Sequence, residues 1–192
     1  RSQKKEKKFS GSLIDYVELV QADPSITKLA HKRLYDVICA EGMQEMSSEN
    51  PRKRKIFNGD SIKVYDYFKE EFFGMENVIE KLMRFLKAAA LRGEESRQVL
   101  LLMGPVGAGK SALTEHIKKA LDGQKYYHLK DDPQRGEPLQ LIPRSLRSDF
   151  EKMLNVKIEG DISPIARWKL LEDYGGKYEE FQVMESTFSQ RG

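Results

Sequence analysis

The sequence is poor in the residues that build disulfides and metal sites. It contains one cysteine and three histidines in 192 residues. A single cysteine cannot form an internal disulfide, and Cys39 stands in an apolar helical pattern, so we interpret it as a small buried hydrophobe. His31, His116 and His128 lie far apart in the sequence and lack the spacing of metal ligands.

Long hydrophobic runs are also absent. No apolar stretch approaches the roughly 20 residues that span a bilayer, and no secretory apolar region follows the basic N-terminus. Hydrophobic residues make up 39% of the chain, enough for a core, and charged residues make up 33%. We therefore expect no membrane association and a soluble protein of a reducing compartment, which implies a cytoplasmic localisation.

An excess of one charge is lacking as well. The formal net charge is +3 at pH 7, so no global field favours nucleic acid, and a nucleic-acid partner is not expected. Basic residues do cluster at 1–8 and at 52–55. We interpret both clusters as a solvated terminus and a solvated loop, with a contact to an acidic partner as the alternative.

One segment carries a specific chemical signature. The apolar run 99–103 passes into a glycine-rich turn and then into an amphipathic helical pattern. A buried strand, a turn G-x4-G-K-[ST] and a helix together form a phosphate-binding loop, the Walker A motif. The candidate nucleotide-binding residues are Gly104, Pro105, Val106, Gly107, Ala108, Gly109, Lys110 and Ser111.

Each residue type in this loop has a physical role. Glycines let successive backbone N–H groups surround phosphate oxygens, and the helix that follows directs its positive dipole end at the same anion. Lys110 is expected to reach the β- and γ-phosphates of ATP, and the Ser111 hydroxyl to bind Mg²⁺. The alternative, a glycine-rich turn that binds nothing, is disfavoured by the apolar run before the loop and the helical pattern after it.

The rest of the pattern divides the chain into three parts. Residues 1–46 are expected to form an N-terminal appendage, a hairpin of two helices over 12–20 and 24–41 that ends at Gly42. Residues 47–61 are polar and basic and predict a surface loop. Residues 62–192 are expected to form a partial nucleotide-binding domain, with a strand at 99–103 and its parallel neighbour at 124–129. Helices are predicted at 144–154 and 163–174, and a last strand at 181–184.

The order of aromatic segment, helix, strand and phosphate loop resembles the front half of an AAA+ ATPase module. In that superfamily the segment before the first helix lines the adenine pocket, and here it matches Phe72, Phe73, Gly74 and Met75. Adenine favours flat apolar walls, and a glycine lets the backbone approach the ring. Phe73 and Gly74 are the main candidates. In the alternative interpretation, Phe72 and Phe73 are simple core residues.

The resemblance extends to one family, the AAA domain of PrkA-type bacterial proteins, conventionally called serine protein kinases. The similar stretches are 29–35, 72–74, 100–106, 137–143, 158–164 and 174–176. The resemblance implies an α/β fold of the P-loop NTPase type, AAA+-like, with a parallel sheet flanked by helices. It also implies ATP and Mg²⁺ as ligands and a homo-oligomer of the full-length protein, because AAA+ sites are completed by a neighbouring subunit.

Motifs for turnover are not found in the sequence. No apolar run ending in Asp-Glu, the Walker B pair, follows Ser111, and no arginine finger or lid can be placed. We therefore expect a truncated module that binds ATP without its hydrolytic half, and we assign no catalytic residue. The His-Arg-Asp and Asp-Phe-Gly motifs of eukaryotic-type protein kinases are missing too, and a protein substrate stays unknown.

Two other functions stay open at this point. A small-substrate P-loop kinase would contact its acceptor through Arg135, Arg144, Arg147 or Arg167, although the helical segment before the phosphate loop has no purpose in such an enzyme. A nucleotide-gated binding module would use the 52–55 cluster on an acidic partner, and its partner binding would depend strongly on salt.

Overall fold

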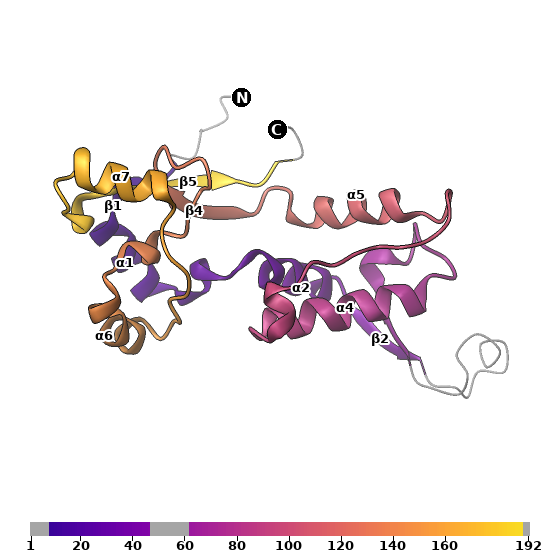
Figure 1. Cartoon of the computed structure of the whole chain (residues 1–192). Coiled ribbons are helices and arrows are strands. Elements are labelled where there is room, and N and C mark those ends of the chain that lie inside the picture. Colours follow the sequence, from indigo (N-terminus) through magenta and orange to yellow (C-terminus); the bar gives the residue numbers. More distant parts are fainter. Residues whose placement is uncertain (1–7, 47–61, 190–192) are drawn as a thin grey trace, which may run out of the picture. The chain divides into compact units, whose positions relative to one another are not determined.

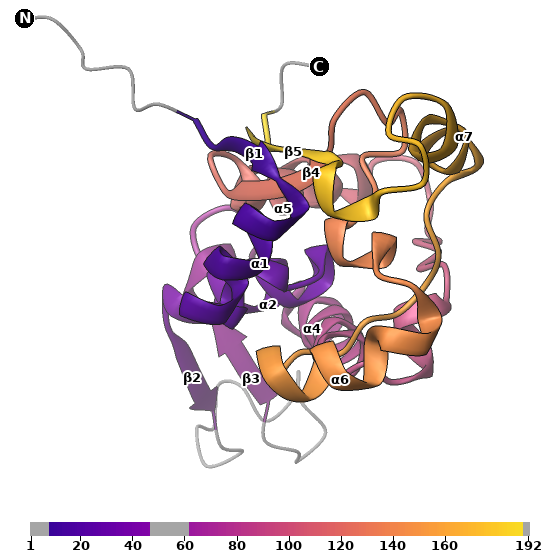
Figure 2. The ribbon, with the colours of Figure 1, turned by 90° about the vertical axis from the view of Figure 1, so that its left-hand side faces the viewer.

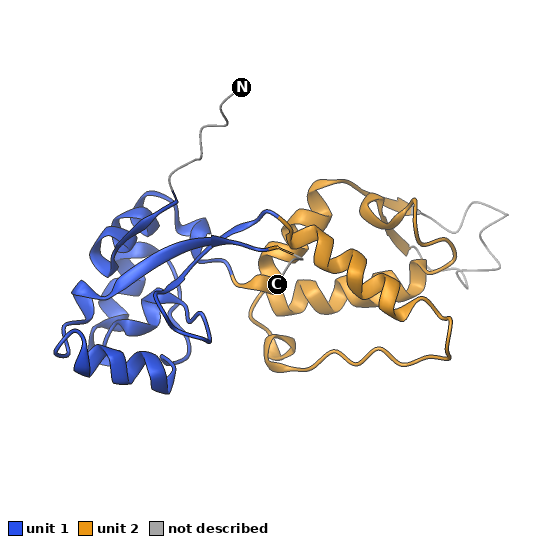
Figure 3. Ribbon diagram, turned by 90° about the horizontal axis from the view of Figure 1, so that it is seen from above, with its two compact units in different colours: residues 1–28, 123–188 blue, residues 29–122, 189–192 orange. Residues whose placement is uncertain are grey.

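The computed structural model describes residues 8–46 and 62–189, whose elements Figure 1 labels in chain order. The chain forms two compact units (Figure 3). The first unit combines the N-terminal residues up to 28 with residues 123–188, and the second is built from residues 29–122. The chain therefore begins in the first unit, builds the second and returns to the first.

The first unit is built on a three-stranded antiparallel sheet in the order β1-β5-β4. The strands, which Figure 2 shows side by side, are β1 (Ser10–Ser12), β4 (Lys125–Leu129) and β5 (Gln182–Thr187). Val183 in the central strand pairs with Gly11 of β1 and with Leu129 of β4. The side chains of Val183 and Leu129 are fully buried, so the register of the sheet is fixed by its core face.

Helix α1 (Leu13–Ala22) begins directly after β1 because Ser12 and Asp15 form a capping box. The Ser12 backbone N–H donates to the Asp15 carboxylate at 2.7 Å, and the Asp15 N–H donates to the Ser12 hydroxyl. The apolar face of α1 then packs into the core of the first unit. The largest buried side chains of that core are Tyr16, Phe181, Leu13, Leu129, Ile142 and Leu154.

A long connection from β4 to β5 completes the first unit. Its elements are η4 (Pro138–Leu141), α6 (Arg144–Leu154), α7 (Pro164–Glu172) and η5 (Tyr178–Glu180). Ser163 caps α7 by accepting a hydrogen bond from the Ala166 N–H at 2.9 Å, and its hydroxyl donates to the buried Asp132 at 2.7 Å. This buried pair holds the start of α7 against the turn after β4.

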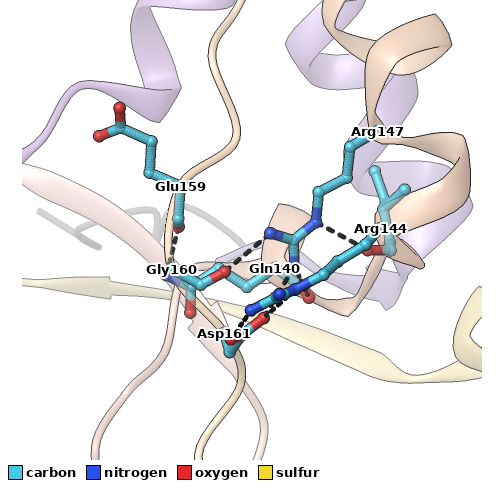
Figure 4. A network of polar contacts seen from close by, with 7 residues as sticks. Gln140, Arg144, Arg147, Glu159, Gly160 and Asp161 are labelled. Carbon is cyan, nitrogen blue, oxygen red and sulfur yellow. Dashed lines mark hydrogen bonds and ion pairs between the residues drawn. The ribbon is translucent and has the colours of Figure 1, made fainter.

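Arg147 of α6 fixes the loop before α7 (Figure 4). Its guanidinium donates to the carbonyl oxygens of Gln140 at 3.0 Å, Ile142 at 3.0 Å and Gly160 at 2.8 Å. Arg144 beside it is far more exposed and forms an ion pair with Asp161. The planar, five-donor fork of arginine suits three carbonyls in different directions, which an ammonium group could not reach together.

The second unit consists of helices and a two-stranded antiparallel ribbon. Its elements are α2 (Ala30–Ala40), β2 (Met43–Met46), β3 (Ile62–Tyr65), η2 (Asp66–Phe68), α4 (Glu76–Ala90), η3 (Glu94–Arg97) and α5 (Lys110–Leu121). Helix α2 packs against both α4 and α5, and α4 also packs against β3. Ile79, Leu82, Met83 and Leu86 recur at helical spacing and form the buried face of α4.

The strand pairing differs from the sequence prediction. The expected parallel pairing of 99–103 with 124–129 is not confirmed, because β4 pairs antiparallel with β5, and no ladder among the described residues includes 99–103. This run forms neither helix nor strand, and Val99, Leu101 and Met103 are 92%, 75% and 84% exposed. The prediction was wrong for β4 because its partner is a segment far along the chain, which local periodicity cannot identify.

The N-terminal part also differs from its prediction. The helix expected over 24–41 is divided into the short turn η1 (Pro24–Thr27) and α2, with extended backbone at Lys28 and Leu29. Helices α1 and α2 fall in different compact units, so the hairpin is not confirmed. The division into 1–46 and 62–192 stays a prediction about domains, and the loop predicted at 47–61 lies outside the described residues. Within the described ranges, no helix is long and apolar enough to cross a membrane.

Candidate functional site

The glycine-rich loop has the backbone geometry that its sequence requires. Gly107 and Gly109 adopt φ angles of +82° and +76°, in the left-handed region that favours glycine. A Cβ on Gly107 would meet no atom within 4 Å, so this glycine is needed for its backbone angle and not to avoid a clash. Residues with a Cβ rarely adopt these φ angles, so the glycines allow a turn of the loop backbone that other residues would resist.

Helix α5 begins at Lys110 without a side-chain cap. Its N-cap residue is Gly109, and the first backbone bond runs from the Leu113 N–H to the Gly109 carbonyl at 2.9 Å. The amide groups of the first turn consequently have no partner within the helix, and they coincide with the positive end of the helix dipole. Such a terminus is suited to an anion with several oxygens, such as a phosphate chain.

The two polar side chains predicted for this site lie at that terminus. The Lys110 ammonium donates hydrogen bonds to the carbonyl oxygens of Gly104 at 2.8 Å and Pro105 at 2.6 Å. Ser111 is exposed in the first turn of the same helix. The lysine thus folds back over its own loop, and a bound phosphate would offer it a stronger, charge-assisted acceptor than these carbonyls.

A cleft of about 410 Å³ borders the loop on the side of α4. Met75, Val78, Lys81 and Leu82 line it, together with residues 100–105 and Lys110. The sulfur of Met75 lies 3.7 Å from the position that a Cβ on Gly109 would occupy, so Met75 lies beside the phosphate loop. Of the predicted adenine segment, the structure thus places Met75 at the cleft beside the predicted phosphate loop, whereas Phe73 lines a different pocket, near Tyr65 and Phe68.

Within that segment the predicted residues have different environments. Phe72 belongs to the buried core of the second unit, whereas Phe73 is 80% exposed. Gly74 has a φ of +74° and open space around it. Phe72 therefore has the core role that the alternative interpretation gave it, and the adenine contacts of Phe73 and Gly74 stay a prediction.

Two residues near the site were not identified from the sequence. Lys81 of α4 lines the cleft beside the loop, but a single lysine on an amphipathic helix carries no distinguishing signal. His116 is buried on the apolar face of α5 together with Leu113 and Ala120. Its position on that face, at the spacing of the core residues, is the signal that could have identified it.

The left-handed glycines and the uncapped start of α5 are the features of a phosphate-binding loop, in a chain that combines helices and strands. Comparison with known proteins makes this specific. The family model described as the PrkA AAA domain matches residues 11–192. The chain therefore belongs to the PrkA AAA domain family, as its sequence motifs predicted.

Curated relatives agree with this family. The "ATP-dependent protease PrkA" of Bacillus subtilis (strain 168) is 34% identical over 99% of this chain and 29% of its own length. The "Serine/threonine kinase YeaG" of Escherichia coli (strain K12) is 32% identical over 91% of this chain and 28% of its own length. A shorter similarity, 31% over 36% of this chain and 7% of the relative, links it to the mitochondrial Lon protease homolog of Rattus norvegicus.

The chain spans less than a third of the length of the Bacillus and Escherichia relatives named above. No solved structure was found to match it.

Proposed function

We propose that this chain is the ATP-binding module of a PrkA-type protein and holds Mg·ATP in the loop from Gly104 to Ser111. The observation that carries the proposal is the pair of left-handed glycines, Gly107 and Gly109, leading into the uncapped start of α5. Backbone amides and a helix dipole converging on one point favour a polyphosphate over a monoanion. The names of the Bacillus and Escherichia relatives, an ATP-dependent protease and a serine/threonine kinase, both denote activities that consume ATP.

Each loop residue has a proposed role. The Lys110 ammonium would leave the Gly104 and Pro105 carbonyls and bind the β- and γ-phosphates, and the Ser111 hydroxyl would be a ligand of Mg²⁺. Among the residues that the structure describes, no group of three or more His, Cys, Asp or Glu is arranged to hold a metal ion. Phosphate oxygens and water would provide further magnesium ligands. Phe73 and Gly74 would contact the adenine.

The purpose for which the whole protein uses ATP is a further part of the proposal. One relative is named a protease and the other a serine/threonine kinase, and we propose that this module serves a serine protein kinase of the PrkA type. The full-length protein would be a cytoplasmic homo-oligomer in which a neighbouring subunit completes the ATP site.

The small-substrate kinase is a weaker candidate. Of the four arginines that would contact its acceptor, Arg147 binds three carbonyls of its own unit and Arg144 pairs with Asp161. Arg135 donates to the hydroxyl of Tyr126. These guanidinium groups already bind partners within the protein, and these partners account for the three arginines without an acceptor substrate. The binding module on 52–55 depends on residues outside the described ranges, and no observation favours it.

The decisive experiment is a calorimetric titration of the chain with Mg·ATP. Lys110→Ala is expected to lower the affinity at least a hundredfold, because a charged hydrogen-bond donor to phosphate is lost. The matched control is Lys119→Ala, an exposed lysine in the last turn of the same helix, which is expected to bind as wild type does. Equal affinities of the two variants would refute the assignment.

Ser111→Ala tests the magnesium role separately. It is expected to weaken ATP binding several-fold in the presence of Mg²⁺ and to change little in the presence of a chelator. Thr114 is the control, because its hydroxyl donates to the Lys110 carbonyl at 3.0 Å and points back along the helix. If Ser111→Ala has the same effect with and without Mg²⁺, the hydroxyl has another role.

A further inference from the structure

The cleft beside the phosphate loop contains a cationic side chain that the proposed phosphate contacts do not use. Among the described residues that line this cleft, the charged ones are Lys81 of α4 and Lys110 of α5, and none is a carboxylate. Most of the other side chains in the lining are apolar, among them Met75, Val78, Leu82, Leu113 and those of 100–103. Such a lining fits a ligand with an apolar body and with groups that accept hydrogen bonds.

Lys81 has no partner in the described part of the protein. Its ammonium forms no hydrogen bond or ion pair with the residues of 8–46 and 62–189. Asp and Glu are missing at the positions three and four residues away on either side, so no neighbour on the helix can pair with it. Arg84, on the same helix, pairs instead with Glu80 at 2.9 Å. The described fold therefore leaves the Lys81 ammonium available to a ligand.

Helix α4 places Lys81 at a distance from the phosphate loop. Met75, the N-cap residue of α4, lies beside Gly109 of the loop. Val78 and Lys81 follow at intervals of three residues, and all three side chains line the cleft. At 1.5 Å per residue, Lys81 is about 9 Å further along the helix than Met75. A ligand whose phosphates lie at the loop would therefore direct its other end towards Lys81.

The other end of ATP has the chemistry that this part of the cleft requires. Val78 of α4 and Leu101 of the run before the loop are 45% and 75% exposed, and both line the cleft. Such apolar side chains can cover the flat faces of a base. The edges of adenine carry ring nitrogens that accept hydrogen bonds, and a lysine ammonium only donates them. Lys81 therefore complements a ring nitrogen of the base.

We propose that Lys81 is a specificity-determining residue of the nucleotide site, which donates a hydrogen bond to a ring nitrogen of adenine. The proposal depends on the ATP site proposed above. It does not involve Phe73, which lines a different pocket. Because Lys81 is exposed to water, the hydrogen bond is expected to raise the affinity for ATP by a factor of about three to ten.

The first test compares ATP with inorganic tripolyphosphate, which has no base, in calorimetric titrations with Mg²⁺. Lys81→Met should bind ATP about three- to tenfold more weakly than wild type and tripolyphosphate within about twofold of it. The control is Lys87→Met, which removes the same charge from the last turn of α4 but does not line the cleft. It should bind both ligands as wild type does. The urea midpoint of Lys81→Met should equal that of wild type, because Lys81 has no partner in the described fold.

The second test identifies the acceptor on the base. The analogues 1-deaza-ATP, 3-deaza-ATP and 7-deaza-ATP each replace one ring nitrogen of adenine by a C–H group. Wild type should bind one of them about three- to tenfold more weakly than ATP, and Lys81→Met should bind that analogue as well as it binds ATP. For the other two analogues, the ratio of their affinity to that of ATP should be the same in both proteins. Such a cycle separates a direct contact from an indirect effect of the substitution.

The outcomes separate the two proposals. If wild type binds neither ATP nor tripolyphosphate, the ATP site is wrong and the role of Lys81 falls with it. If wild type binds both and Lys81→Met weakens them equally, Lys81 acts on the phosphates, so the base contact is overturned and the ATP site stands. The base contact is also overturned if Lys87→Met loses as much ATP affinity as Lys81→Met, or if all three analogues show the same ratios in wild type and Lys81→Met.

Discussion

The ammonium group of Lys110 lies 2.8 Å from the carbonyl oxygen of Gly104, the first residue of its own loop. In this state the side chain folds back over its own loop. The bond is exposed to water, as is the second one to Pro105, so each contributes at most about 1 kcal/mol to stability. Lys110 is thus held weakly enough to be released by a ligand.

Lys110→Met is therefore expected to separate stability from binding. Without nucleotide, its free energy of unfolding should lie within about 1 kcal/mol of wild type. With Mg·ATP at a hundred times the dissociation constant, wild type should gain about 2.7 kcal/mol and the variant almost nothing. Chemical denaturation with and without Mg·ATP measures both values, with Lys119→Met as the control. A variant that gains as much as wild type would exclude Lys110 from the site.

Gly107→Ala tests whether the left-handed turn of the loop is functional. The φ of +82° should cost an alanine about 1 kcal/mol of stability, although no atom lies within 4 Å of the added Cβ. Gly123→Ala is a matched control, since Gly123 has a φ of +77° and equally open space but lies after α5. Both variants should lose similar stability in a urea titration, and only Gly107→Ala should lose ATP affinity.

A loss of ATP affinity in both glycine variants would mean that general destabilisation, and not the loop conformation, is responsible. Unchanged affinity in Gly107→Ala would show that the turn at this position does not need to be left-handed for binding.

Arg147→Lys is expected to destabilise the first unit by about 1–3 kcal/mol, because three backbone carbonyl groups, two of them in part-buried contacts, lose their donors. The guanidinium reaches the carbonyls of Gln140, Ile142 and Gly160, and its side chain is 14% exposed. Arg144→Lys is the control, since the Arg144 side chain is 77% exposed and its ion pair should contribute less than about 1 kcal/mol. Urea unfolding measures the difference, and equal effects of both substitutions would contradict the role assigned to Arg147.

The sequence predicted those elements whose signals are local. The proline and serine at 163–164 correctly marked the start of α7, and the apolar spacing of 78–86 identified α4. The loop glycines were identified because their backbone angles depend on the residue itself. Strand pairing was not predictable in this way, because β4 pairs with 182–187, and alternation within a strand does not name its partner.

The break between η1 and α2 escaped prediction for a related reason. The helical pattern runs through Lys28 and Leu29, but the boundary between the compact units falls between these two residues. Tertiary packing of α2 on α4 and α5 therefore overrides a continuous local pattern. His116 was set aside for lack of metal-ligand spacing. Its contacts with Tyr67 and Glu71 join residues far apart in the sequence, so only the folded structure reveals them.

The capping box of α1 predicts an acid-sensitive contact. The pKa of the Asp15 carboxyl is lowered from its ordinary value of 3.8, chiefly because the Ser12 backbone N–H donates to it and further because the Ser12 hydroxyl does. A carboxyl whose pKa is lowered by folding stabilises the folded state at every pH above its pKa in the unfolded chain. This contribution is lost as the pH falls through its lower pKa in the folded chain. The stabilising contribution of Asp15 is therefore lost at and below about pH 3.8.

An NMR titration of the Asp15 carboxyl carbon measures this directly. In Ser12→Ala the pKa should rise only part of the way to 3.8, because the backbone N–H, the larger cause, is still present. Ser10→Ala is the control, since Ser10 precedes the cap in β1 and its substitution leaves both donors in place. A wild-type pKa at or above 3.8 would mean that the capping box does not form in solution, and α1 would then need another explanation for starting at Leu13.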